Sequence, residues 1–211
     1  MRITWLGHSS LKLETGSKII FIDPYAGSEE DYYPCNLVLI SQWSFDHCKI
    51  SYVRKAIGDQ THVLGTKEAA ANIYPCGELR VGERRTFDNI EIVGVESFNE
   101  KPTFREETKT SMLGFLIKAE GKTIYFMGDS DFFEELTDLK PDLLLISTGG
   151  TYTMTPEEAA KATHLITPKL SIPIHWGSLE GTKDSAELYK ELVEQKGGFV
   201  KVLEPGNNII I

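Results

Sequence analysis

The chain has few cysteines, a deficit of basic residues and no long apolar run. Its three cysteines, Cys35, Cys48 and Cys76, are odd in number and form no CxxC pair, which favours free thiols in a reducing cytoplasm. Lys and Arg total 22 against 31 Asp and Glu, giving a net charge of −9, so nucleic acid is not the expected partner. Because no apolar run approaches the length that crosses a bilayer and Met1-Arg2 leads straight into a strand pattern, no signal peptide, anchor or membrane association is expected.

What remains is the composition of an ordinary globular protein. The chain has 211 residues, of which 41% are hydrophobic, enough to bury a sizeable core. No low-complexity segment or linker interrupts it. We therefore predict one domain over residues 1–211 and a small-molecule partner, and leave the oligomeric state open.

The order of predicted elements repeats. The first part begins with short strand patterns and continues with helix patterns around a further strand, and the second part does the same. Strands are predicted at Arg2–Leu6, Leu11–Glu14, Lys18–Asp23, Leu37–Ser41, His62–Gly65, Arg80–Val81, Arg85–Phe87, Ile90–Glu96, Met112–Lys118, Thr123–Met127, Asp142–Ser147, Leu170–Ile174, Phe199–Leu203 and Asn208–Ile211. Helices are predicted at Ser51–Ile57, Thr66–Ile73, Asp131–Leu139, Thr155–Ile166 and Ser185–Lys196.

One helix start is well marked. Thr155 is a suitable N-cap, Pro156 falls at the first helical position, and Glu158 completes a capping box. Two successive sets of strands, each followed by strand–helix units, predict two mixed sheets packed face to face with helices outside, an α/β αββα sandwich.

Polar clusters follow three of the apolar strands directly. They are Asp46-His47, then Asp129 with Ser130 and Asp131, and His175. Strand ends in layered α/β proteins gather at one sheet edge, so these side chains can converge. Each cluster alone is more typical of a turn or a structural histidine. Together they supply two imidazoles and two carboxylates, a donor set that suits zinc, manganese or iron.

Several stretches resemble the metallo-β-lactamase superfamily, in particular its lactonase-like metal-dependent hydrolases, the relatives of L-ascorbate-6-phosphate lactonase. The resemblance covers most of the chain in the family's order, and it implies the αββα sandwich that the element order predicts. Six stretches carry the resemblance: "ITWLGHSS", "IIFIDPY", "LVLISQWSFDH", "IYFMGDSD", "LLISTGGTYTMTPEEAA" and "IPIHWG". The last two are the most specific.

The resemblance also implies which ligands are present. The family's first metal loop is H-x-H-x-D-H, and here Asp46 and His47 match while Gln42 and Ser44 replace two histidines. Asn99 stands where the family has a third histidine, and the alternative position in residues 103–105 has none either. Asp129 matches the carboxylate between two metals, and His175 matches the last histidine. The resemblance therefore implies half of a dinuclear centre, with Asp46, His47, Asp129 and His175 around one metal.

Such a site can keep a coordination position open to water. We expect one divalent metal, zinc first with manganese or iron as alternatives, and a hydrolase acting on a small ester, lactone or phosphodiester. Asp46 is the catalytic candidate, as ligand and base together or as ligand only. The alternatives are a catalytically inactive pseudo-enzyme that binds a ligand or partner, and redox chemistry at an iron.

Three further residues are candidates for the pocket. His8 lies just after the first strand and is either at the pocket rim or a turn histidine bonded to backbone. Tyr152 follows Gly149-Gly150 and either lines the pocket or packs under the turn. Arg105 could face an anionic substrate or be a solvated loop charge.

Overall fold

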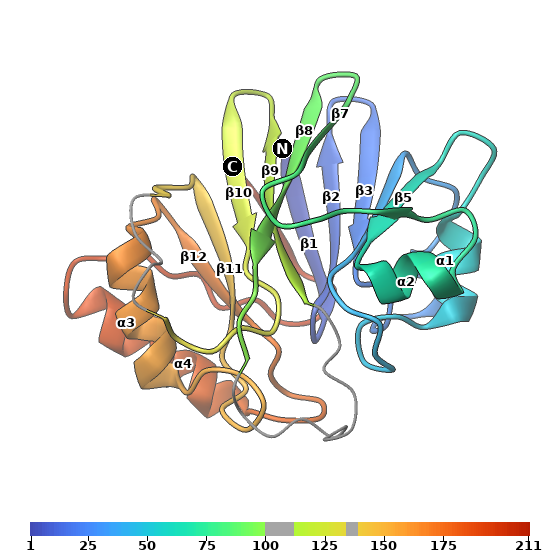
Figure 1. The fold of residues 1–211 in the computed structure, drawn as a ribbon. Helices are drawn as coiled ribbons and strands as arrows, with labels where there is room; N and C mark the ends of the chain where they lie inside the picture. The colour runs from blue at the N-terminus through green and yellow to red at the C-terminus, as the bar shows by residue number, and fades with distance from the viewer. Residues whose placement is uncertain (100–111, 134–138) are drawn as a thin grey trace.

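Two mixed β-sheets pack face to face in the computed structural model, which describes residues 1–99, 112–133 and 139–211 (Figure 1). Helices α1 (Ile50–Ala56) and α2 (Lys67–Asn72) cover the outer face of one sheet, and α3 (Pro156–Ile166) and α4 (Lys183–Glu194) cover the outer face of the other. The αββα architecture predicted from the element order is confirmed.

The first sheet has seven strands in the order β13-β1-β2-β3-β4-β5-β6. Strands β3, β4, β5 and β6 are parallel to one another, and the remaining neighbours, including β2 and β3, pair antiparallel. Their bounds are β1 (Arg2–Gly7), β2 (Ser10–Thr15), β3 (Lys18–Ile22), β4 (Leu37–Ile40), β5 (His62–Gly65), β6 (Gly77–Glu78) and β13 (Asn208–Ile210).

The second sheet has six strands in the order β12-β11-β10-β9-β8-β7. Strands β10, β11 and β12 are parallel, so their carboxyl ends meet at one edge. Their bounds are β7 (Arg84–Phe87), β8 (Ile90–Glu96), β9 (Leu113–Ala119), β10 (Lys122–Phe126), β11 (Leu143–Ser147) and β12 (Ser171–Ile174).

The main core lies between the two sheets. Trp5 and Ile3 of the first sheet and Phe115 and Phe126 of the second are fully buried there. Each large apolar side chain buried in this way contributes roughly 1.5–3 kcal/mol. Alternate residues of the parallel strands, such as Val38 and Leu144, face the helices instead, which explains why these strands read as continuous apolar runs.

Some predicted elements differ from the structure. Phe199–Leu203 is not a strand, because only Val200 bridges β12 before the chain leaves for the other sheet. Val81 makes a single bridge to Gly94, and the strand near it is Gly77–Glu78. The structure also has a short 3₁₀ helix at Glu29–Asp31 that was not predicted.

Part of one predicted helix lies outside the described residues. Of the segment Asp131–Leu139, residues 134–138 are not described, and the flanking residues 131–133 and 139 are not helical. None of the helices in the described ranges is long and apolar enough to cross a membrane.

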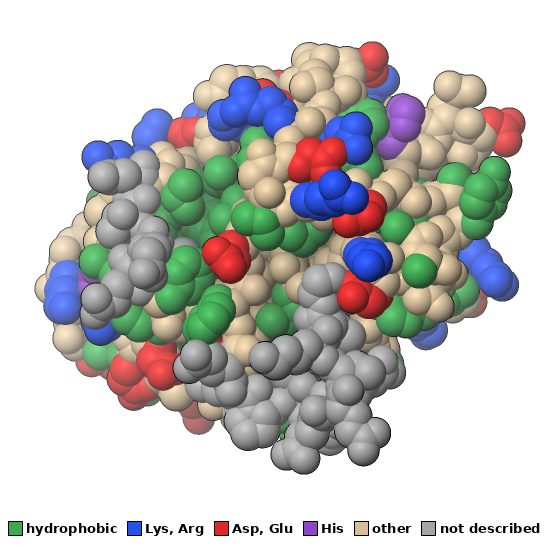
Figure 2. Space-filling model, in the orientation of Figure 1, with side chains coloured by type: hydrophobic (Ala, Val, Ile, Leu, Met, Phe, Trp, Pro, Cys, Tyr) green, Lys and Arg blue, Asp and Glu red, His purple; other side chains and the backbone are tan. Residues whose placement is uncertain are grey.

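Charged side chains of both signs alternate over β7 and β8 (Figure 2). Arg84 pairs with Glu91 at 3.1 Å, and Lys118 of β9 reaches the same carboxylate at 3.0 Å. Charges on an edge strand such as β7 discourage pairing with another chain, so this face is suited to contact with solvent.

The two sheets are hydrogen-bonded to each other at one edge of the sandwich. Gln42, just beyond β4, bridges to Met112, just before β9. The His175 N–H, beyond β12, donates to the carbonyl of His8, beyond β1, at 3.0 Å. Loops from both sheets are thereby held side by side, and these loops carry the polar clusters that the sequence singled out.

Candidate metal centre

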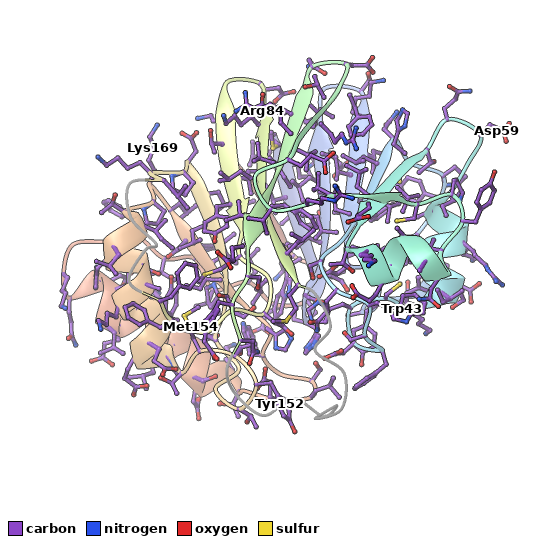
Figure 3. All side chains as sticks on the ribbon, in the orientation of Figure 1. Trp43, Asp59, Arg84, Tyr152, Met154 and Lys169 are labelled. Carbon is purple, nitrogen blue, oxygen red and sulfur yellow. The ribbon has the colours of Figure 1, made fainter. Side chains whose placement is uncertain are left out.

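Asp46, His47, Asp129 and His175 converge at this edge, each on a loop that follows a strand. Asp46 and His47 follow β4, Asp129 follows β10, and His175 follows β12. Trp43 and Tyr152, which belong to the same set of loops, lie in the lower part of Figure 3, whereas Arg84 of β7 lies near the upper end of the sandwich.

His47 is fully buried between two carboxylates. Its Nδ1 is 2.8 Å from Asp23 Oδ2, and its Nε2 is 2.8 Å from Asp129 Oδ2. Burial opposes the charged imidazole, but the charges of Asp129 and Asp23 outweigh it and raise the pKa of His47 well above its usual value. Asp23 in turn accepts from the backbone N–H of Ser41 at 2.7 Å and from its hydroxyl at 2.5 Å, which fixes the ring.

His175 is held in the same way by another acid. Its Nδ1 lies 2.7 Å from Glu180 Oε1, a close ion-pair contact, and its Nε2 lies 3.1 Å from Asp129 Oδ1. Burial lowers the pKa of His175, but Asp129 and Glu180 more than offset it and bring the pKa to about 9. Glu180 also accepts from the backbone N–H groups of Thr151 and Tyr152, both at 2.8 Å, so one buried carboxylate ties His175 to the loop after β11.

Asp129 therefore faces two imidazoles. Burial alone would raise the pKa of its carboxyl, yet the neighbouring His175 and His47 hold that pKa well below its usual range. An ionised carboxylate facing two ring nitrogens offers donor types that a divalent metal such as zinc accepts.

Asp46 is the most accessible of the four, with its side chain 17% exposed. Its Oδ1 accepts from the Ser44 hydroxyl at 2.7 Å, and its Oδ2 is 3.5 Å from His8 Nε2. Burial works against ionisation, but contact with His8 and the charge of His47 lower the pKa of Asp46 below its usual range.

The residues at the degenerate positions occupy different places. Gln42 Nε2 donates to Ser44 Oγ at 3.0 Å and to Asp129 Oδ2 at 3.2 Å, so these two side chains bond to each other and to the cluster. Asn99 Nδ2 donates instead to the carbonyl of Tyr152 at 2.8 Å.

His8 is buried inside the cluster, with 1% of its surface exposed. Its ring packs against that of His175 at a centroid distance of 3.7 Å, with the two planes tilted by 40°. Burial lowers the pKa of His8 to about 4, so this imidazole is neutral. His8 was predicted as either a rim residue or a turn histidine; it lies in the turn between β1 and β2, with its ring buried against His175.

Two candidates for the pocket remain, Tyr152 and Arg105. Tyr152 contributes its backbone to the loop that Glu180 and Asn99 hold. Arg105 lies outside the described residues.

Two acids of the site were missed at the sequence level. Asp23 follows β3 just as the other clusters follow their strands, and that signal could have found it. Glu180 lies in an irregular loop and gives no such signal.

The donor set fits a metal ion. His175 Nε2 and Asp129 Oδ1 face each other, and within the described part of the chain neither takes part in a hydrogen bond. Buried polar atoms normally have partners. Donor atoms, one each from His8, Asp46, His47 and His175, lie within 4.8 Å of one another, and imidazole nitrogens and carboxylate oxygens are the ligands of zinc, manganese and iron.

The chain belongs to the beta-lactamase superfamily, whose domain profile matches residues 2–175. Among curated proteins it is 27% identical to a UPF0173 metal-dependent hydrolase of Saccharolobus solfataricus, over 100% of this chain and 99% of the relative. Relatives with the same description occur in Methanopyrus kandleri (28% identity, 99% of each chain).

Solved structures share the fold. A metallo hydrolase from the archaeon Ignicoccus hospitalis matches with a TM-score of 0.82 and 23% identity, over 99% of this chain and 97% of the other. The diiron β-hydroxylase CmlA of Streptomyces venezuelae matches with a TM-score of 0.73 and 15% identity, over 100% of this chain and 54% of the other. These likenesses establish the metallo-β-lactamase fold.

Proposed function

We propose that this protein is a metal-dependent hydrolase with one divalent metal held by Asp46, His47, Asp129 and His175. The observation that carries the proposal is that buried donor atoms converge: Asp129 Oδ1 lies 3.1 Å from His175 Nε2, and Asp129 Oδ2 lies 2.8 Å from His47 Nε2. The name that the Saccharolobus relative bears, metal-dependent hydrolase, supports the same class.

One metal is proposed rather than two because of the neutral side chains beside the site. Gln42 and Ser44 offer an amide and a hydroxyl, which bind transition metals poorly. They also direct hydrogen bonds at Asp129 Oδ2 and Asp46 Oδ1. A second ion would have to displace both bonds.

The chain's own groups supply orientation and proton handling. Bound here, a divalent metal would polarise a carbonyl or phosphoryl oxygen and bring the pKa of water towards ~7. Asp23 and Glu180 fix the two imidazole rings from behind. Asp46, the most exposed carboxylate of the cluster, is the group that would accept a proton from the attacking water.

Apolar side chains beside the site support a small ester or lactone in preference to a phosphodiester. Phe45 is 53% exposed next to Asp46, and Leu179 is 46% exposed next to Glu180. The Phe45 ring also packs edge-on against Tyr25 at 6.4 Å. Lys101 and Arg105, the cations that an anionic substrate could use, lie outside the described residues.

The test measures metal content and hydrolysis together. Protein purified without chelator is analysed for zinc, manganese and iron and assayed with a nitrophenyl ester, a lactone and a nitrophenyl phosphodiester. We expect about one metal per chain and an activity that His175→Ala abolishes. If the wild type binds no metal and hydrolyses no faster than His175→Ala, the proposal is wrong.

A second variant tests the lost site. Gln42→His/Ser44→His should raise the metal content from about one towards two, by ligand count. Asn99 is left unchanged because it holds the Tyr152 carbonyl. Gln42→Ala/Ser44→Ala, which removes the same hydrogen bonds without adding imidazoles, is the matched control and should stay at about one.

One observation favours the pseudo-enzyme as the second candidate. The cluster already pairs its buried charges internally, with His47 between Asp23 and Asp129. Such a network can be stable without turnover. A wild type that binds one metal and hydrolyses nothing, while the histidine double variant becomes active, would favour this alternative.

A further inference from the structure

His8 has a left-handed backbone conformation, which is uncommon for residues other than glycine. Its φ is +50°, in the left-handed region, and His175 opposite has a φ of +64°. Non-glycine residues are held there when the surroundings enforce it, commonly at functional sites. The carbonyl of His8 accepts from Trp5 Nε1 at 2.9 Å and from the His175 N–H at 3.0 Å, so the position of His8 is fixed from both sheets.

The ring of His8 is held at one nitrogen and open at the other. Its Nδ1 shares a hydrogen bond with Ser178 Oγ at 2.9 Å. Its Nε2 is buried and, across the described ranges, has no hydrogen-bond partner, although Asp46 Oδ2 is 3.5 Å away. A polar group at Nδ1 that leaves Nε2 free is how metal-ligating histidines are oriented.

One ligand atom each from His8, Asp46, His47 and His175 can be chosen so that all four lie within 4.8 Å of one another. With metal–nitrogen bonds of ~2.0–2.1 Å, opposite ligands of one ion are about 4 Å apart, so this span is close to that of one coordination sphere. We propose that His8 Nε2 is a third imidazole ligand of the same metal. This inference rests on the proposed metal site and adds a ligand to it.

A third imidazole would also compensate for the imidazoles that are missing from the loop after β4. Gln42 and Ser44 stand where imidazoles are missing, and both are on the β4 side of the cluster. His8 reaches the cluster from the turn between β1 and β2. The single ion would thus be bound by three nitrogens and the carboxylates, a set suited to zinc.

The experiment counts imidazole ligands in the cobalt-loaded protein. In Co²⁺-substituted protein, ring N–H protons of ligating histidines give strongly shifted signals in proton NMR that vanish in D₂O. We expect three such signals in the wild type and two in His8→Phe, a variant that keeps an aromatic ring against His175. His62→Phe, at an exposed histidine whose ring packs against Phe87, is the control and should keep three. The Co²⁺ affinity of His8→Phe should fall at least ~10-fold, the smaller end of what loss of even an outer partner costs.

Each result decides the question. Two signals in the wild type, with His8→Phe unchanged in signals and affinity, would overturn the inference and leave the metal site standing. A wild type that binds no Co²⁺ overturns both proposals. If His8→Phe fails to fold, Ser178→Ala takes its place, because it should shift only the signal of His8. No shift there also refutes the third ligand.

Discussion

At the scale of single residues, the site depends on acids that would not themselves bind the metal. Asp23 and Glu180 each contact the Nδ1 of one imidazole and leave its Nε2 directed at Asp129. Partners of this kind set the tautomer and orientation of a ligating ring. Replacing either acid should therefore weaken metal binding more than it lowers the stability of the fold.

Glu180→Gln tests this dependence. The amide cannot balance the charge at His175 Nδ1, so metal affinity should fall by about 10–100-fold. Titration with zinc against a competing chelator measures the affinity. Glu187→Gln, at an exposed position on α4, removes the same charge and should leave the affinity unchanged. Equal losses in both variants would mean that the overall charge, not the His175 contact, is responsible.

Phe45→Ala tests whether the apolar side chains beside the site bind the substrate. If Phe45 contacts the substrate, its loss should raise KM for an apolar ester about 10-fold, the equivalent of ~1.4 kcal/mol of lost burial, with a smaller change in kcat. Phe199→Ala is the matched control, since Phe199 is 69% exposed and is bonded to Ser171 at the far end of β12 from His175. An unchanged KM in Phe45→Ala would show that Phe45 does not take part in substrate binding.

At the scale of elements, the sequence predicted features that depend on neighbouring residues better than features that depend on tertiary contacts. The α3 start at Thr155 was predicted because its capping box involves residues three apart, and the structure confirms both hydrogen bonds, at 2.8 and 3.3 Å. Phe199–Leu203 has an apolar pattern but no neighbouring strand beyond Val200, and only the tertiary structure decides that. The convergence of Asp46 with His175 followed from their places after strands, whereas Glu180 had no periodic context.

Thr155→Ala measures what the cap contributes. It removes the acceptor for the Glu158 N–H, and we expect a loss of ~1 kcal/mol in the free energy of unfolding. Thr155→Ser retains the hydroxyl and should lose much less. Urea denaturation of both variants is the measurement, with metal content expected to stay the same. A Thr155→Ser variant as unstable as Thr155→Ala would point to packing of the methyl group.

At the scale of the whole molecule, the charged cluster links stability to pH. Its ionisable groups lie at an edge where the two sheets are hydrogen-bonded to each other. A change of protonation there acts on both sheets together. The dependence should be clearest in metal-free protein, because a bound metal competes with protons for the same nitrogens.

For chelator-treated protein we expect stability to fall as the pH rises through the alkaline range. Surrounding charges raise the pKa of His175 from 6.5 to about 9 in the folded state, although burial opposes this. The stabilisation is therefore complete below pH 6.5 and is lost as the pH rises through about 9. Thermal unfolding between pH 6 and 10, approximately the window that this shift defines, measures it. His175→Gln should flatten the profile, and an equally steep profile in that variant would assign the effect to another group.

The pairing of β13 with β1 has a consequence for how the chain is made. Ile3 lies opposite Ile209, and His175, the last of the proposed ligands in the chain, bonds to the turn after β1. During synthesis, the N-terminal strands emerge long before these partners do. Until then the outer edge of β1 is an unpaired strand that can pair with another chain, and contacts of such long range form slowly. A chain that ends before residue 175 would therefore lack both the strand that covers the outer edge of β1 and one ligand of the proposed metal centre.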